Sequence, residues 1–149
     1  MKLAQTIEER LCFLEDQFQL MQLLNDYQRF TDEADPEAWA NCWVEDAVVA
    51  RAGDPEPMRG RKELAAGVAK SIAQFDTRQH VLTNPSFQID GDHATGVCGL
   101  VYTGRMNGAG IEDYVQFGGS YRWGFRRTAE GWKIATREMV TDWKRPVPG

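Results

Sequence analysis

The spacing of the hydrophobic positions changes between the first and the second half of the chain. In the first half, apolar side chains recur every three or four residues, at Ile7, Leu11, Leu14, Phe18, Met21, Leu24 and Tyr27. This spacing predicts a long helix that buries the stripe from Phe18 to Tyr27 against a sheet. From residue 77 onward the period becomes two, which is typical of strands. A helical half followed by a strand-rich half predicts an α+β fold rather than alternating α/β units.

The ends of the first helix are marked by the residues around them. Thr6 and Glu9 have the spacing of a capping box, which predicts that the helix begins there. The helical pattern runs to about Thr31 or Asp32, with a potential break near Asp16. Asp32 is therefore expected at the carboxyl end of the helix.

Start and turn signals divide the remainder of the chain. Asp35 followed by Pro36 is a helix start, and Gly91 with Asp92 is a hairpin signal. The elements predicted after the first helix are a short helix through Trp39 and Trp43, a strand at 47–50, a helix at 60–74, and strands at 79–89 (broken by Pro85), 93–106, 112–127 and 131–143. Consecutive strands with short connections predict a mostly antiparallel sheet, curved around the N-terminal helices with a pocket at its mouth.

Composition narrows the class of protein. The 149 residues fit one domain, 1–149, and the net charge of −5 without a basic patch argues against nucleic acid or a membrane as partner. Aromatic residues make up 11% of the chain, which suits a pocket lined by rings. The three cysteines Cys12, Cys42 and Cys98 are widely spaced, so we expect no disulfide framework and a cytoplasmic location. The first residues lack the apolar stretch of a signal peptide, and no apolar run is long enough to span a bilayer.

Two histidines occur in the sequence, and they differ in setting. His93 follows Asp92 in the predicted turn and is expected in solvent. His80 lies in a predicted strand, where alternation puts it on one face with Leu82 and Asn84. If that face lines the curved sheet, His80 lies in the pocket. The alternative is a structural histidine without a chemical role.

Three further residues are candidates for the same site. Asp32 would oppose the helix dipole at a cost of about 0.3–1 kcal/mol, which favours a functional placement over a solvated one. Beside His80, its carboxylate would fix the ring tautomer and make the other nitrogen a usable base. Tyr27 lies one turn earlier and is either a hydrogen-bond donor to substrate or a core aromatic. Strict alternation puts Arg137 on the face opposite Ile134 unless a bulge intervenes. The alternative to a role in the site is that Arg137 is a solvated surface residue.

Other common site chemistries lack their sequence signatures. The chain has no phosphate-cradling glycine loop before a helix and no Gly-x-Ser-x-Gly elbow. Its two histidines and its acidic residues do not form a spaced metal triad. We therefore expect a protein that uses no cofactor and no metal.

Several segments, taken in order, resemble SnoaL-like domains of the nuclear-transport-factor-2-like superfamily. They are Leu20 to Tyr27, Asp32 with Asp35, Ala38-Trp39, Glu45-Asp46-Ala47, Arg59-Gly60, His80 with Asn84, Ile89 to Ala94, and Gly131 to Ile134. The resemblance implies a cone-shaped α+β barrel that commonly forms homodimers or homotrimers. Within the superfamily the chain is most similar to scytalone dehydratase, bile-acid dehydratases and hexachlorocyclohexane dehydrochlorinase.

The resemblance implies a His–Asp dyad at His80 and Asp32, with Tyr27 and Arg137 at positions matching the bile-acid dehydratases. It also has departures. Arg51 or a neighbour stands where those dehydratases have a second tyrosine. The second histidine of scytalone dehydratase has no match, and Phe30 lies near the place of the dehydrochlorinase lysine.

These observations favour a cofactor-independent lyase, dehydratase-like, acting on a small hydrophobic cyclic substrate. His80 would be the general base, Asp32 would orient it, Tyr27 would stabilise an oxyanion, and Arg137 would support Asp32 or bind substrate. Two alternatives remain: an isomerase or cyclase using the same base, and a non-catalytic ligand-binding or assembly domain.

Overall fold

The computed structural model describes residues 6–145. The expectation that no signal segment opens the chain falls partly on residues 1–5, which lie outside the described residues. The elements in chain order are α1 (Ile7–Asp32), α2 (Pro36–Asn41), β1 (Trp43–Arg51), β2 (Met58–Arg59), α3 (Arg61–Ile72), β3 (Phe75–Asp90), β4 (His93–Met106), β5 (Val115–Thr128) and β6 (Gly131–Arg145). Within residues 6–145, no helix combines the length and apolar character that a bilayer crossing requires.

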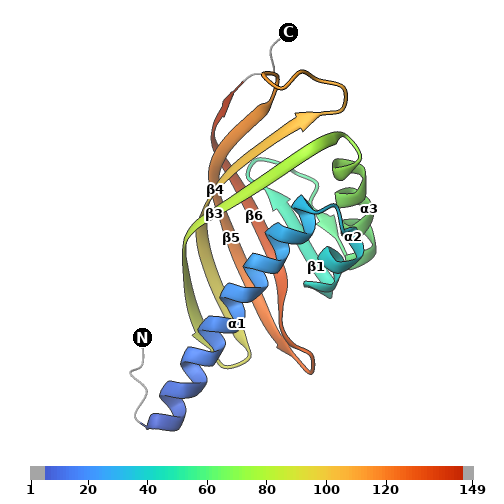
Figure 1. The fold of residues 1–149 in the computed structure, drawn as a ribbon. Coiled ribbons are helices and arrows are strands. Elements are labelled where there is room, and N and C mark those ends of the chain that lie inside the picture. Colours follow the sequence, from blue (N-terminus) through green and yellow to red (C-terminus); the bar gives the residue numbers. More distant parts are fainter. Residues whose placement is uncertain (1–5, 146–149) are drawn as a thin grey trace.

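The strands form one strongly curved sheet in the order β2-β1-β6-β5-β4-β3. Neighbouring strands are antiparallel except β1 and β6, which run parallel. The sheet does not close, because β2 and β3 remain at its two edges. Helix α1 lies across the concave face, while α2 and α3 cover one end (Figure 1). The predicted α+β cone is therefore confirmed, as a mixed and open sheet.

Helix α1 begins and ends as local rules require. The Thr6 side chain accepts a bond from the Glu9 amide at 3.1 Å and the Glu9 carboxylate accepts one from the Thr6 amide at 2.9 Å, so the predicted capping box is present. The helix is continuous through Asp16, and the predicted break is wrong. At the other end, Ala34 has a φ of 60° and forms the left-handed residue of a Schellman motif.

The predicted burial of the α1 stripe is wrong for its first half. Phe18 is 69% exposed and Met21 38% exposed, whereas Leu24 and Tyr27 are each 2% exposed. Each residue turns a helix by about 100°, so the nine residue steps from Phe18 to Tyr27 turn it by two full turns and a further 180° or so. Phe18 and Tyr27 therefore lie on opposite sides of α1. The buried face is made by Asp16, Leu20, Leu23, Leu24, Tyr27 and Thr31.

The segment after α1 differs in its details from the prediction. Asp35 caps α2 by accepting a bond from the Ala38 amide at 3.0 Å, as expected. The short helix ends at Asn41, however, and Trp43 opens β1 as a fully buried strand residue. The strand predicted at 47–50 is therefore longer than expected: it begins four residues earlier, at Trp43, and ends at Arg51.

Strand β3 carries His80 and Leu82 toward the interior, but not Asn84. The register between β3 and β4 shifts between Thr83 and Ser86, and Asn84 there is exposed with a φ of 50°. Pro85 has no backbone N–H to give to the ladder, which favours a bulge at this point. The grouping of Asn84 with His80 on one face is thus wrong.

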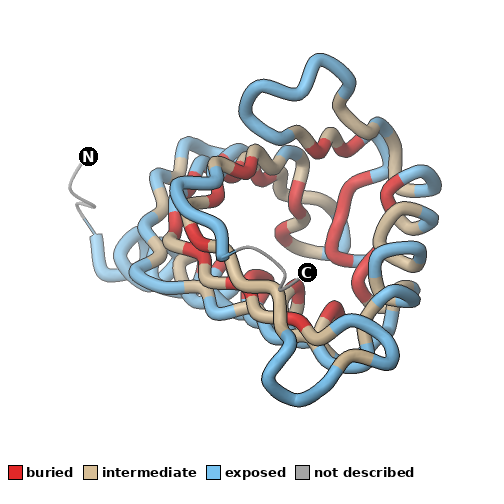
Figure 2. The backbone as a smooth tube through the Cα atoms, turned by 90° about the horizontal axis from the view of Figure 1, so that it is seen from above, coloured by how far each residue is buried: buried red, intermediate tan, exposed pale blue. Residues whose placement is uncertain are grey.

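Viewed from above, helices and strands surround one interior, and the buried residues are spread around it (Figure 2). Aromatic rings dominate this core. Its largest fully buried side chains are Trp43, Tyr27, Phe125, Leu20, Leu24, Leu64 and Ile134. The wide end of the cone contains the candidate site.

Candidate active site

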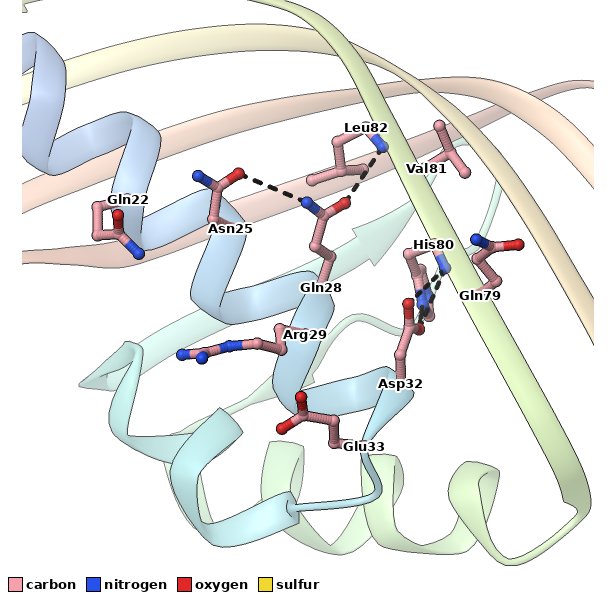
Figure 3. A pocket seen from close by; sticks show the side chains of 10 residues that line it. All are labelled: Gln22, Asn25, Gln28, Arg29, Asp32, Glu33, Gln79, His80, Val81 and Leu82. Carbon is pink, nitrogen blue, oxygen red and sulfur yellow. Dashed lines mark hydrogen bonds and ion pairs between the residues drawn. The ribbon is translucent and has the colours of Figure 1, made fainter.

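Asp32 and His80 meet where the end of α1 crosses β3. Asp32 Oδ1 lies 2.7 Å from His80 Nδ1, and Asp32 Oδ2 accepts a bond from the His80 backbone N–H at 2.9 Å (Figure 3). The Asp32 side chain is 22% exposed and that of His80 10% exposed. A carboxylate next to Nδ1 favours the neutral tautomer in which Nδ1 carries the proton and Nε2 has a free lone pair. The sequence-predicted pair is thus in contact.

The His80 ring faces the aromatic interior rather than bulk solvent. Its centroid lies 4.8 Å from that of Tyr102 and 6.3 Å from that of Tyr27, both in edge-on geometry. Among residues 6–145, no group forms a hydrogen bond with Nε2. Burial raises the pKa of Tyr102 to about 12, so its hydroxyl stays protonated at neutral pH. The free nitrogen of His80 therefore faces a neutral aromatic wall.

The dyad separates two hollows in the surface. Outside, a polar groove of about 580 Å³ runs between α1 and β3, with Asn25, Gln28 and Gln79 along it (Figure 3). Inside, a cavity of about 460 Å³ opens at the wide end of the cone. The inner cavity is lined by apolar and aromatic residues together with polar and basic ones, a mixture that is found in small-molecule sites. Its ring-bearing lining residues are Tyr27, Trp39, Phe75, His80, Tyr102, Phe117 and Tyr121.

Arg137 reaches this cavity because β6 contains a bulge. Phe125 pairs with Ile134, whereas Gly124 pairs with Thr136, so one residue of β6 is unpaired between them. The extra residue places Arg137 on the same face as the buried Ile134, which strict alternation would not do. We expected Arg137 to lie on the face opposite Ile134 only if no bulge intervened. Because a bulge is present, the two residues lie on the same face.

Arg137 contacts two tyrosines and no carboxylate within residues 6–145. Its guanidinium donates to the Tyr27 hydroxyl and lies 4.8 Å from the Tyr121 ring centroid. Its Nε is buried without a partner. A buried cation is normally paired with an anion. Arg137 is instead held in place by rings and a hydroxyl alone. The expected support of Asp32 by Arg137 is not among its contacts.

The Tyr27 hydroxyl is occupied by protein groups. It accepts from Arg137 and donates to the Tyr121 hydroxyl, 3.4 Å away, and the residue is 2% exposed. Complete burial raises the pKa of Tyr121 well above its ordinary value, so Tyr121 remains a neutral phenol. The three side chains form one chain of contacts from Arg137 through Tyr27 to Tyr121.

Three features of the site were missed in the sequence. Tyr102 and Tyr121 line the cavity from β4 and β5, and period-two alternation in those strands could have found them. Arg78 was also missed, although it shares a face with His80. It donates to the backbone carbonyls of Thr31 at 3.2 Å and Phe75 at 2.7 Å, and so ties the end of α1 to β3.

The remaining reactive groups do not form a second centre. Burial raises the pKa of Cys42 to about 12 and that of Cys98 above its ordinary value, so both buried thiols stay protonated. Cys12 is exposed on α1. His93 is exposed as predicted, but it is the first residue of β4 and not part of the turn. In the described part of the chain, no three His, Cys, Asp or Glu side chains gather closely enough to hold a metal ion.

The SnoaL-like domain family matches residues 13–138, so the chain belongs to this family. Among solved structures, an NTF2-like protein with a cystatin-like fold from Novosphingobium aromaticivorans is 30% identical, with a TM-score of 0.75 over 95% of this chain and 92% of that chain. Among proteins of curated function, none matches the chain by sequence.

Two more distant structures share the fold. One, provisionally assigned as a scytalone dehydratase and also from Novosphingobium aromaticivorans, is 18% identical with a TM-score of 0.82, over 97% of this chain and 93% of that chain. The other is the hexachlorocyclohexane dehydrochlorinase LinA-type3 from Novosphingobium barchaimii. It is 17% identical with a TM-score of 0.79, over 94% of this chain and 95% of that chain.

Proposed function

We propose that this protein is a cofactor-independent lyase of the dehydratase kind, with His80 as general base toward a small hydrophobic cyclic substrate. The observation that carries the proposal is the double contact of Asp32 with the ring and the backbone of His80. This contact fixes the ring while its Nε2 has no hydrogen-bond partner among residues 6–145 and faces the inner cavity, which is the arrangement that a proton-abstracting base needs. The names of the dehydratase and dehydrochlorinase with the same fold also favour elimination.

The elimination that fits these groups removes water from a cyclic β-hydroxy ketone. His80 Nε2 takes the proton from the carbon between the carbonyl and the hydroxyl-bearing carbon, and the electron pair moves to the carbonyl oxygen as an enolate. The carbon–oxygen bond then breaks while a carbon–carbon double bond forms. The departing hydroxide takes the proton back from His80 and leaves as water. The base ends the reaction in its starting state.

Arg137 is the proposed source of stabilisation for the enolate oxygen. Its positive charge is fixed by the Tyr27 hydroxyl and lines the inner cavity, and a fixed charge of this kind stabilises developing negative charge strongly. Tyr27 is then a positioning residue rather than the donor to substrate. Tyr121, at the end of the same chain of contacts, has its ring centroid 4.8 Å from this charge.

The test uses 3-hydroxy-1-tetralone, whose loss of water gives 1-naphthol. We expect the wild type to form 1-naphthol, and His80→Ala to lose the activity by about 10²–10⁴-fold while keeping its fold. His93→Ala, which changes the exposed histidine, serves as the matched control. Full activity in His80→Ala would contradict the proposal. A product of unchanged mass would instead identify an isomerase, and binding without turnover a ligand-binding domain.

A further inference from the structure

The inner cavity is lined by basic side chains and by no acidic one. Arg51, Arg78, Arg137 and Lys144 are among its lining residues, and no Asp or Glu is. This is unusual for a chain whose net charge is −5. Elsewhere in the described residues, seven of the twelve basic side chains lie within 4.0 Å of a carboxylate (Arg29, Arg61, Arg105, Arg122, Arg126, Arg127 and Lys133), whereas none of the four in the cavity does. The cavity thus concentrates positive charge that the protein does not neutralise.

The four cations fall into two pairs. Arg78 and Arg137 are fixed by protein groups: Arg78 donates to backbone carbonyls, and Arg137 to the Tyr27 hydroxyl. Arg51 and Lys144 are exposed, and within residues 6–145 neither side chain forms a hydrogen bond or an ion pair. The second pair is therefore free to bind a ligand.

Arg51 and Lys144 approach the cavity from two different strands. Arg51 is the last residue of β1 and pairs in register with Met139, while Lys144 lies near the end of β6 and pairs with Phe117. Met139 and Phe117 both line the cavity. The two exposed cations thus each lie next to an apolar residue of the cavity wall, so they can contact the polar end of a ligand whose apolar part lies inside.

We propose that the substrate is a cyclic compound that carries a carboxylate, bound by Arg51 and Lys144 while its ring lies among the aromatic side chains. That this ligand is the substrate rests on the proposed function, whereas the binding of its carboxylate by Arg51 and Lys144 does not. An arginine fork matches a carboxylate with two parallel hydrogen bonds, and a lysine adds a compact charge. Arg78 and Arg137 behind them raise the potential of the whole cavity, which further favours an anion over a neutral ligand.

The test compares the binding of 2-naphthoate and 2-naphthamide, which have the same ring system and differ in charge. Calorimetric titration of the wild type should show the carboxylate binding about three- to tenfold more tightly, the size expected for exposed charge pairs. This preference should shrink toward about 1 M salt, where charges are screened beyond about 3 Å. The Arg51→Gln/Lys144→Gln double variant should lose most of this preference, with only the contribution of Arg78 and Arg137 remaining, and Lys62→Gln, an exposed lysine of α3, should keep the preference in full.

Two results would overturn the proposal. One is equal affinity of the wild type for both compounds, including no measurable binding of either. The other is a double variant that keeps the wild-type preference. The same titrations in His80→Ala separate this proposal from the proposed function, because the preference for the carboxylate should persist there whether or not His80 is a base. Loss of turnover with an intact preference, and the reverse, are therefore distinguishable.

Discussion

Asp32 holds His80 at two points, the ring Nδ1 at 2.7 Å and the backbone N–H at 2.9 Å. Asp32 is the last residue of α1, and His80 lies in β3, so the contact also joins the end of the helix to the edge of the sheet. The carboxylate opposes the dipole of its own helix, and the two donors of His80 offset that cost. The position of the candidate base is thereby set by the backbone of β3 as well as by a rotamer.

Asp32→Asn should disturb the His80 ring more than the fold. An amide can still accept a bond from the His80 backbone N–H, but it no longer provides a charged acceptor for Nδ1–H. We expect the wild-type ring to carry its proton on Nδ1, and the variant ring to populate both tautomers. Nitrogen-15 NMR of the histidine side chains measures the tautomer directly. Turnover should fall by about 10²–10⁴-fold, which is the range supplied by general base catalysis.

Glu33→Gln is the matched control for this change, because Glu33 is the exposed carboxylate next in the chain. It should leave both the tautomer and the turnover unaltered. An Asp32→Asn protein whose His80 ring keeps a single Nδ1–H tautomer would show that the carboxylate does not orient the base.

Arg137→Met tests whether the buried guanidinium serves function rather than stability. Methionine has a similar length and needs no hydrogen bonds, and Arg137 has a buried Nε without a partner. Removing an unpaired buried charge is expected to leave the free energy of unfolding unchanged or to raise it by about 1 kcal/mol. Turnover should fall by about 10²–10³-fold, as when one oxyanion donor is removed. A variant that unfolds readily, or one that retains its turnover, would contradict this assignment; urea denaturation and kcat decide.

Part of the fold and of the candidate site could be predicted from the sequence, and the rest could not for physical reasons. The capping box at Thr6 and Glu9 is local, so it was readable. The meeting of Asp32 with His80 was expected chiefly from the resemblance to SnoaL-like lyases, which implies a His–Asp dyad at these two positions. Arg137 could not be placed, because one unpaired residue in β6 reverses the face of everything after it.

Two other predictions were wrong because burial depends on how the helix and the sheet pack against each other. The apolar stripe of α1 begins on a side that no strand covers, so Phe18 is exposed in spite of its spacing. The sequence predicts a break near Asp16, but Asp16 is buried against the sheet, where it accepts hydrogen bonds from Arg127 at 2.7 Å and from the Trp132 indole at 2.8 Å. Contacts between residues more than 100 positions apart leave no mark in a local pattern.

Asp16 should make the stability of the protein depend on pH. Hydrogen bonding from Arg127 holds the pKa of Asp16 below its ordinary value of 3.8, with the Trp132 bond adding to this and burial opposing it. A lowered folded-state pKa stabilises the fold fully above pH 3.8, and that contribution is lost as the pH falls below 3.8. Asp16→Asn should therefore cost about 1–3 kcal/mol at neutral pH, and the difference from wild type should shrink in acid.

The measurement for Asp16 is urea denaturation at several pH values, with Glu15→Gln as the control on the neighbouring exposed carboxylate. Glu15→Gln should track the wild type at every pH. A difference between wild type and Asp16→Asn that stays constant from neutral pH to well below pH 3.8 would mean that the charge of Asp16 does not contribute.

Ala34→Gly should stabilise the protein by about 0.5–1 kcal/mol, because Ala34 occupies a left-handed conformation that costs a residue with a Cβ about 1–2 kcal/mol. The Schellman bonds around it, from the Asp35 amide to the Phe30 carbonyl at 2.8 Å and from the Ala34 amide to the Thr31 carbonyl at 3.2 Å, need only backbone atoms and should persist. Ala66→Gly, at an exposed position inside α3, should instead destabilise by about 0.5–1 kcal/mol. Since these bonds fix the end of α1 next to Asp32, Ala34→Gly should leave turnover intact. Equal destabilisation by both glycines in thermal and urea unfolding would show that the strain at Ala34 is not relieved by losing the Cβ.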